Sequence, residues 1–406
     1  MHHLPDTYSL RGDFVFTPGQ PPREQTWINV AGGTIVGIGP PAPGPEVVLS
    51  GCGIVPGLIN AHAHLEFSSL TEPLGTPGMH LPAWIGEVFR WRSASGQSTG
   101  DPTAIGIRES LEAGVVAVGD IRTGGKLPQQ SPLHLIAFEE LIATGSEQCD
   151  AAAERARQYA TSTPPSRVRL GLSPHAPYSV AAPLWQQAIA LATERAMPLT
   201  VHLAETRDEL AFLSEGTGPF VDLLAARDAA EFVPAGTRPL DFLQFLASAP
   251  QVLLAHGNYL SAEEIAFLAA HRERFSLVYC PRTHAYFGHE PYPLDAFLQA
   301  QLNVAVGTDG RGSNPDLNLF AELQFLASRF DSLSGDTLLR MGTLAGANAL
   351  GLSDQLGTLE AGKEASLAVV RLGEGRDPYD RLFAASSRVE ATLVAGHLAA
   401  GRLESA

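Results

Sequence analysis

Two histidines stand one residue apart at the end of an apolar run, in residues 57–68 (GLINAHAHLEFS). Residues two apart in a strand point to the same face, so His62 and His64 would project together from a strand. Two neighbouring imidazoles can bind one metal ion. Paired histidines are also common on protein surfaces, so this pair alone leaves metal binding and a surface role equally open.

Further ionisable residues end other short apolar runs. His175, His202 and His256 each close a run, and Asp309 closes the last one, in VAVGTDG. Singly, each has an ordinary explanation, as a half-buried hydrogen-bonded histidine or as a carboxylate that caps the next helix. If these ends meet at one edge, several neutral imidazoles and one carboxylate come together. That donor set suits Zn²⁺ or Fe²⁺ rather than Mg²⁺ or Ca²⁺, and it predicts a metal site.

The elements that would position these residues repeat along the chain. Short apolar runs alternate for the most part with helix-like patterns, which predicts a parallel α/β architecture. Eight such units fit a (β/α)₈ barrel, which builds its active site at the C-terminal ends of the strands. An open doubly wound sheet would need a glycine-rich phosphate turn after the first strand, where this chain has His-Ala-His. The runs cover residues 53–64, 114–121, 133–140, 167–179, 197–206, 251–260, 275–284 and 303–310, and the helix-like patterns 102–114, 150–161, 181–196, 261–271 and 292–301.

The two ends of the chain carry a different pattern. Residues 8–52 and 365–402 alternate and turn like short antiparallel strands. Neither segment has enough strands to bury a face alone, so we expect one small β-sandwich built from both ends. The expected domains are residues 1–54 plus 358–406 for the β domain and 55–357 for the barrel.

The composition of the chain limits the kinds of molecule that we expect it to bind. The 406 residues are 45% apolar and carry a formal net charge of −16, which does not favour nucleic acid or an anionic membrane surface. Three cysteines without a C-x-x-C pair argue against a disulfide framework. The N-terminus lacks an apolar signal core and no window approaches a membrane span, so we expect a cytoplasmic protein that acts on a small molecule.

Two motifs resemble the amidohydrolase superfamily of metal-dependent barrel hydrolases. IVPGLINAHAHLE is similar to its first-strand signature, and residues 343–370 (TLAGANALGLSDQLGTLEAGKEASLAVV) are similar to its C-terminal signature. The family usually has Ala-Asp near the end of that segment, where this chain has Ala365-Ser366. The resemblance covers essentially the whole chain. It implies four metal ligands, which are His62, His64, His202 and Asp309.

The resemblance also bears on the number of metal ions. Members with two metals bridge them with a modified lysine at the end of the fourth strand. That run ends here in SPHAPYS, without a lysine, and neither Lys126 nor Lys363 is near it in sequence. We therefore expect one divalent ion, Zn²⁺ or Fe²⁺.

The segment VHLAET resembles the mononuclear deaminase branch of the family. His202 and Glu205 form His-x-x-Glu, as in deaminases of cytosine, adenosine and S-adenosylhomocysteine. A carboxyl group beside a divalent ion can shuttle protons. By resemblance, His256 and Asp309 orient a hydroxide on the metal and take its proton, so the expected catalytic residues are Glu205, His256 and Asp309.

Substrate contacts are expected from the segments around this rim. His175 resembles the substrate-contacting histidine of nucleoside-type deaminases, and a long insertion after the first strand carries Glu66 and Trp84. That insertion is similar to aminodeoxyfutalosine deaminases. The seventh run departs from the deaminases, because it reads Cys-Pro-Arg-Thr-His and puts His284 where they have asparagine. We expect His175, Glu66, Trp84 and His284 to contact substrate.

The expected function is hydrolysis of an amino-substituted nitrogen heterocycle, a purine or pyrimidine or its nucleoside, with release of ammonia. Two alternatives on the same scaffold stay open, a chlorohydrolase of a triazine-like ring and a cyclic-amide hydrolase. A more remote alternative is a non-catalytic scaffold protein, but such relatives typically lose metal histidines and this chain keeps all of them. Whether the chain forms a homo-oligomer stays open.

Overall fold

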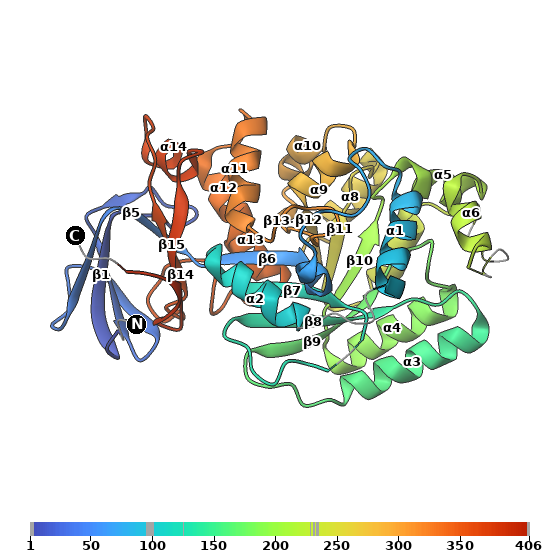
Figure 1. The fold of residues 1–406 in the computed structure, drawn as a ribbon, viewed down its shortest axis with the longest axis horizontal. Coiled ribbons are helices and arrows are strands. Elements are labelled where there is room, and N and C mark those ends of the chain that lie inside the picture. The colour runs from blue at the N-terminus through green and yellow to red at the C-terminus, as the bar shows by residue number, and fades with distance from the viewer. Residues whose placement is uncertain are drawn as a thin grey trace.

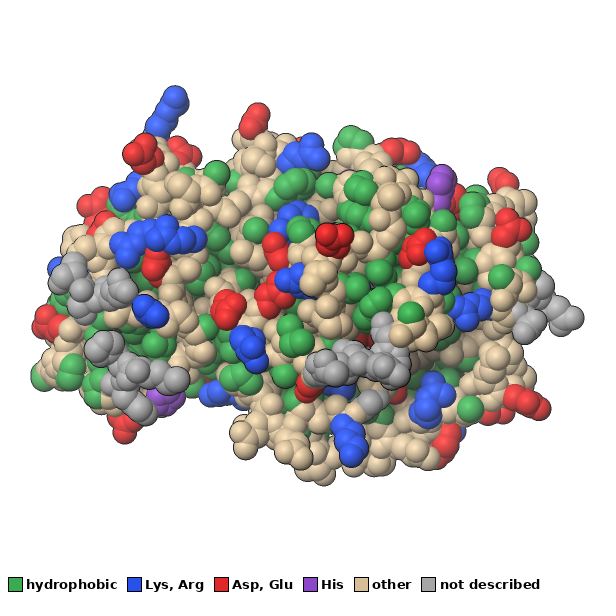
Figure 2. Space-filling model, viewed as in Figure 1, with side chains coloured by type: hydrophobic (Ala, Val, Ile, Leu, Met, Phe, Trp, Pro, Cys, Tyr) green, Lys and Arg blue, Asp and Glu red, His purple; other side chains and the backbone are tan. Residues whose placement is uncertain are grey.

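The computed structural model describes residues 4–94, 101–124, 126–227, 229, 232 and 235–403, and it divides into a helix-covered barrel and a separate sheet (Figure 1). The sheet lies at one end of the elongated molecule and holds both ends of the chain. Acidic and basic side chains are interspersed over the face drawn in Figure 2. Within the described residues, no helix is long and apolar enough to cross a membrane.

Eight parallel strands form the barrel in the order β13-β12-β11-β10-β9-β8-β7-β6. A bridge between Ala63 and Asp309 joins the first strand to the last and closes the ring. Each expected apolar run contains one strand, so the barrel prediction is confirmed. The strands are β6 (Leu58–Ala63), β7 (Val115–Arg122), β8 (His134–Leu141), β9 (Val168–Pro174), β10 (Leu199–Leu203), β11 (Val252–His256), β12 (Phe275–Tyr279) and β13 (Asn303–Val306).

These strands are buried along almost their whole length, which explains their continuous apolar sequences. Every residue of β7 and β8 is buried, because the barrel interior covers one face and helices cover the other. The helices are η1 (Leu65–Ser69), α1 (Leu81–Ala94), α2 (Pro102–Glu112), α3 (Ser146–Ala160), α4 (Ala182–Arg195), α5 (Arg207–Glu215), α6 (Pro219–Ala225), α7 (Pro239–Leu246), α8 (Ala262–Ala270), α9 (Pro281–Phe287), α10 (Leu294–Gln299), α11 (Leu319–Arg329), α12 (Gly335–Gly342), α13 (Leu344–Ala349) and α14 (Pro378–Phe383).

Both ends of the chain contribute to the second sheet, as the sequence predicts. Its order is β16-β15-β14-β5-β1-β3-β4, with β2 paired to β1, and it encloses a core of its own around Tyr8, Ile28 and Leu367. The C-terminal β14 pairs with the N-terminal β5, and β5 runs directly into the barrel strand β6. The strands are β1 (Thr7–Val15), β2 (Arg23–Glu24), β3 (Trp27–Ala31), β4 (Thr34–Gly39), β5 (Glu46–Pro56), β14 (Leu367–Arg371), β15 (Arg388–Val394) and β16 (His397–Gly401). The domain limits of 1–54 plus 358–406 and 55–357 stay a prediction.

The insertion after β6 forms η1 and α1 at the rim of the barrel. Helix α1 packs against α6, which follows β10 and α5. Trp84 also ties α1 to the loop after β13, because its indole N–H donates to the carbonyl of Gly312 at 3.0 Å. The insertion therefore lies over the strand ends where the ionisable residues were expected.

Candidate metal centre and active site

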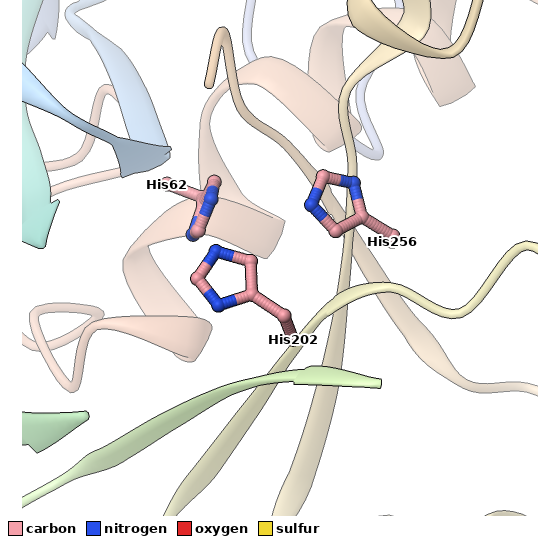
Figure 3. Close-up of side chains that lie close together, drawn as sticks. All are labelled: His62, His202 and His256. Carbon is pink, nitrogen blue, oxygen red and sulfur yellow. The ribbon is translucent and has the colours of Figure 1, made fainter. Parts of the chain in front are cut away.

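Four histidines and one aspartate converge where the barrel strands end. His62 lies in β6 and His64 directly after it, His202 lies in β10, His256 ends β11, and Asp309 follows β13. The rings of His62, His202 and His256 point toward one another from these different segments (Figure 3). His62, His64 and Asp309 form a second group with converging ligand atoms, and His62 belongs to both groups.

The distances between the donor atoms suit one metal ion. The Nε2 atoms of His64 and His202 are 3.3 Å apart. The Oδ1 atom of Asp309 lies 3.7 Å from Nε2 of His62 and 3.6 Å from Nε2 of His64. Two ligands at about 2.0–2.1 Å from a tetrahedral ion are about 3.4 Å apart, so these spacings match those of a shared ion.

The hydrogen-bonding state of the histidines also fits a metal. Both ring nitrogens of His62 are buried and have no hydrogen-bond partner in the described part of the chain, which is costly unless a ligand satisfies them. The Nδ1 atom of His202 lies 3.0 Å from the carbonyl oxygen of His175, which fixes the proton on Nδ1 and leaves Nε2 free to bind. Burial, followed by the other histidines, holds the pKa values of His64, His202 and His256 well below their usual range. These imidazoles are therefore neutral, as metal ligands must be.

The backbone at this rim adopts conformations that non-glycine residues seldom take. His256 has φ of 68° and Asp309 has φ of 58°, in the left-handed region. Hydrogen bonds hold both residues: the hydroxyl of Tyr292 donates to the carbonyl of His256 at 3.0 Å, and Ser313 Oγ donates to Asp309 Oδ2 at 3.1 Å. Such conformations cluster at functional sites, where the surrounding structure holds the strained residues in place.

Glu205 lies beside this cluster and is 4% exposed. Its Oε1 is 3.6 Å from Nε2 of His256. Burial, followed by Asp309 and Glu209, raises the pKa of the Glu205 carboxyl well above its usual range. Its backbone is fixed on both sides, because the amide of Asn258 donates to its carbonyl at 2.9 Å and its own N–H donates to Glu209 at 2.8 Å. Glu205 is therefore a buried acid held in one position next to the candidate metal ligands.

A cavity of about 370 Å³ opens onto these groups. His64, His202, Glu205, His256 and Asp309 line its floor, and the inner side of α1 forms an apolar wall. The residues that α1 contributes are Leu81, Trp84, Ile85, Val88, Phe89 and Arg92. This size, with an apolar wall and a few convergent polar groups, is typical of a small-molecule site.

The four expected substrate contacts fall in two groups. His175 and Trp84 line the cavity, whereas Glu66 and His284 are not among its lining residues. Glu66 accepts hydrogen bonds from Arg92 and Thr123 instead. His284 lies in α9 and packs against Tyr279 and Tyr292. A position near a strand end does not determine which way a side chain turns, and substrate contact by Glu66 or His284 stays a prediction without support from the cavity.

Glu140 was not predicted as a site residue from the sequence, although it lines the cavity. It stands at the end of the third apolar run, LHLIAFEE, and the rule that selected His175 would also have selected it. Ser313 and Asn258 were missed as well, because nothing in the sequence marks a serine or an asparagine that supports a neighbouring side chain.

Comparisons with known proteins agree with this architecture. The profile of the amidohydrolase family matches residues 54–399. A curated 5-methylthioadenosine/S-adenosylhomocysteine deaminase from Halobacterium salinarum is 29% identical over 362 residues, which are 83% of this chain and 78% of that protein. The crystal structure of Helicobacter pylori aminofutalosine deaminase with methylthio-coformycin has a TM-score of 0.84 and 22% identity, over 97% of this chain and all of that one. An adenosine deaminase from Xanthomonas campestris with bound zinc has a TM-score of 0.76 and 24% identity, over 98% of this chain and 94% of that one.

Proposed function

Because the chain belongs to the amidohydrolase family, we propose that it is a metal-dependent aminohydrolase that releases ammonia from an amino-substituted nitrogen heterocycle. The observation that carries this proposal is the position of Glu205, a buried carboxyl 3.6 Å from His256 at the floor of the cavity. A neutral carboxyl in this position can give a proton to a ring nitrogen next to the reacting carbon.

His62, His64, His202 and Asp309 would hold one divalent transition metal ion, Zn²⁺ or Fe²⁺. When bound, such an ion lowers the pKa of a coordinated water toward 7 and so supplies a nucleophile at neutral pH. The unpartnered nitrogens of His62 and the free Nε2 of His202 support this donor set.

The remaining roles belong to residues around the cluster. His256 is neutral and lies within reach of Glu205, so it can hold a polar group of the reacting centre by a hydrogen bond. Asp309 would bind the ion through Oδ1, and its Oδ2, which accepts a hydrogen bond from Ser313, has a further lone pair that can take a proton. Glu205 donates its proton to the ring nitrogen, and Asp309 can pass the proton it has accepted to the departing amine, which then leaves as ammonia. Trp84 and Phe89 provide apolar surface against which a flat heterocycle can lie.

The names of the relatives support a nucleoside-like substrate. One is a deaminase of 5-methylthioadenosine and S-adenosylhomocysteine, and a structural neighbour is a deaminase of aminofutalosine. A chlorohydrolase or a cyclic-amide hydrolase on the same scaffold remains the alternative, since Glu205 could protonate a ring nitrogen in either reaction. Location in the cytoplasm stays a prediction.

The released product separates these candidates. The metal-loaded protein should be incubated with a panel of amino-purines, amino-pyrimidines, their nucleosides, a chloro-triazine and a cyclic amide. We expect ammonia from at least one amino-substituted compound. Chloride release or ring opening without ammonia from any compound would contradict the aminohydrolase and favour one of the alternatives.

A further inference from the structure

His284 and His289 form a pair of histidines outside the candidate metal centre. His284 lies in α9 and is 9% exposed, and the half-buried His289 follows the end of that helix. The Nε2 atoms of both rings are buried and have no hydrogen-bond partner in the described part of the chain. A buried polar atom without a partner is costly, so each of these nitrogens needs an ion or a water molecule.

The end of α9 brings the two rings together. Gly288 has φ of 67°, in the left-handed region that glycine adopts without strain. Its N–H donates to the carbonyl of Ala285 at 3.1 Å, and the N–H of His289 donates to the carbonyl of His284 at 3.3 Å. This is the pattern of a Schellman motif, which turns the chain back at the end of a helix. His289 therefore folds back toward His284, and the centroids of their rings are 5.2 Å apart.

The separation of these rings matches that in the candidate metal centre. The ring of His62 lies 5.1 Å from that of His64 and 5.0 Å from that of His202, at interplanar angles of 80° and 81°. The rings of His284 and His289 lie at 5.2 Å and 62°. Two imidazoles at this spacing can bind one ion, since each nitrogen lies about 2.0–2.1 Å from a bound Zn²⁺.

Both imidazoles are in the form that a metal ion requires. Burial lowers the pKa of His284 and that of His289 to about 4, so both rings are neutral at neutral pH. The backbone of Glu290 accepts a hydrogen bond from the ring of His284, and the donor is Nδ1 because Nε2 has no partner. Nδ1 of His289 lies 3.3 Å from Tyr259 Oη, which can accept its proton. A proton on Nδ1 leaves Nε2 free, as is usual for histidines that bind metal.

The pair lies close to the cavity but is not part of its lining. Neither His284 nor His289 is among the residues that line the cavity. Phe287 does line it, and its ring lies 5.7 Å from that of His289. An ion held by this pair would therefore be separate from the ion proposed for the catalytic centre.

We propose that Nε2 of His284 and Nε2 of His289 bind a second divalent transition metal ion at an accessory site. Imidazole ligands suit Zn²⁺, Ni²⁺ and Cu²⁺ rather than Mg²⁺ or Ca²⁺, and water would complete the coordination. An ion held by two side chains is bound more weakly than one held by four. The accessory site should therefore fill only in excess metal and empty on dialysis. This inference does not depend on the aminohydrolase function.

The test uses the full chain with its catalytic site filled with Zn²⁺ and excess metal removed by dialysis. Calorimetry then measures the binding of further Zn²⁺. His2 and His3 are replaced by asparagine in every sample, because two adjacent histidines can bind metal themselves.

The variants are His284→Asn and His289→Asn, each made in that background. His271→Asn is the matched control, because His271 is also half-buried but its ring stacks on Phe267. Thermal unfolding checks that each variant folds. His289→Asn keeps the test decisive if loss of the more deeply buried His284 ring prevents folding.

The background chain should bind about one further Zn²⁺. Either variant should weaken this binding at least about 10-fold, because it removes one of two protein ligands. The content of dialysis-resistant metal should stay the same in both variants, and His271→Asn should bind like the background chain. His202→Ala, which empties the proposed catalytic centre, should still bind Zn²⁺ at the accessory site.

Two results would overturn the inference. If the background chain binds no further Zn²⁺, only water satisfies the two nitrogens. If a folded His289→Asn variant binds further Zn²⁺ as tightly as the background chain, the ion lies elsewhere. Because the readout is metal binding, a failure of the aminohydrolase proposal would appear separately, as an absence of ammonia release.

Discussion

The Nε2 atoms of His64 and His202 lie 3.3 Å apart, although 138 positions separate the two residues in the chain. His64 follows the first barrel strand and His202 lies in the fifth, so only the closed barrel brings them together. Two imidazole nitrogens at this distance can share a hydrogen bond, and they are also spaced like two ligands of one tetrahedral metal ion. This pair therefore connects the fold directly to the predicted metal.

His202→Ala should lose the metal and the activity together, because it removes one of the four proposed ligands and the remaining three would bind more weakly. Metal content is measured by elemental analysis after dialysis, and the parent should hold about one transition metal ion per chain. His284→Asn is the control, because His284 does not line the cavity and should keep the metal. Two tightly bound ions in the parent would contradict the single-metal prediction.

Ser313→Ala should weaken metal binding without removing a ligand. Ser313 Oγ donates to Asp309 Oδ2 at 3.1 Å and is itself 3.0 Å from Thr283 Oγ1. Loss of such a supporting hydrogen bond typically costs about 10- to 100-fold in metal affinity. Competition with a chelator measures the change, and an affinity equal to that of the parent would show that Ser313 does not orient Asp309.

A chain that ends at Glu360 should be insoluble or markedly less stable. It lacks β14, whose residues Leu367–Arg371 pair with Cys52–Pro56 of β5 immediately before the first barrel strand. Removing β14 to β16 uncovers part of the apolar core around β1 and β5 and leaves the edge of β5 unpaired. Soluble yield and thermal unfolding test this. A truncated chain that unfolds cooperatively at the temperature of the parent would contradict a β domain built from both ends.

Glu140→Gln should change how stability depends on pH. Burial, followed by the charge of Glu66, raises the pKa of Glu140 from 4.5 to about 8. The folded state therefore holds this proton more tightly than the unfolded state, and the contribution of Glu140 to stability falls as pH rises from about 4.5 to 8. The uncharged amide has no such dependence, so the variant should gain stability relative to the parent, by at most about 1.4 kcal/mol per pH unit. Denaturant unfolding at pH 5, 6, 7 and 8 measures this, and a constant difference would contradict a raised pKa.

Much of the fold could be predicted from the sequence, because parallel strands buried on both faces leave continuous apolar runs. All eight runs contain a strand, and the helix-like patterns at 102–114 and 181–196 coincide with α2 and α4. The histidines and Asp309 could be selected because they end such runs, and closure of the barrel brings those ends together.

The residues on the substrate side of the site were harder to predict from the sequence. Glu66 and His284 stand close to the strand ends, but Glu66 turns to Arg92 and Thr123, and His284 packs among aromatic rings. Glu140 carries the same strand-end signal as His175 and was overlooked. The direction in which a rim side chain points depends on tertiary partners such as Arg92, and a strand pattern does not contain that information.

The most direct test of the aminohydrolase mechanism is the rate of ammonia release by Glu205→Gln, measured together with its metal content. The amide keeps the size of the side chain and its contact with His256 but cannot transfer a proton. The metal content should equal that of the parent, because Glu205 is not one of the four proposed ligands. Turnover should fall by roughly 10²- to 10⁴-fold, the usual contribution of general acid–base catalysis. A rate within a few-fold of the parent, with metal fully bound, would show that Glu205 does not shuttle the proton and would contradict the mechanism proposed for this site.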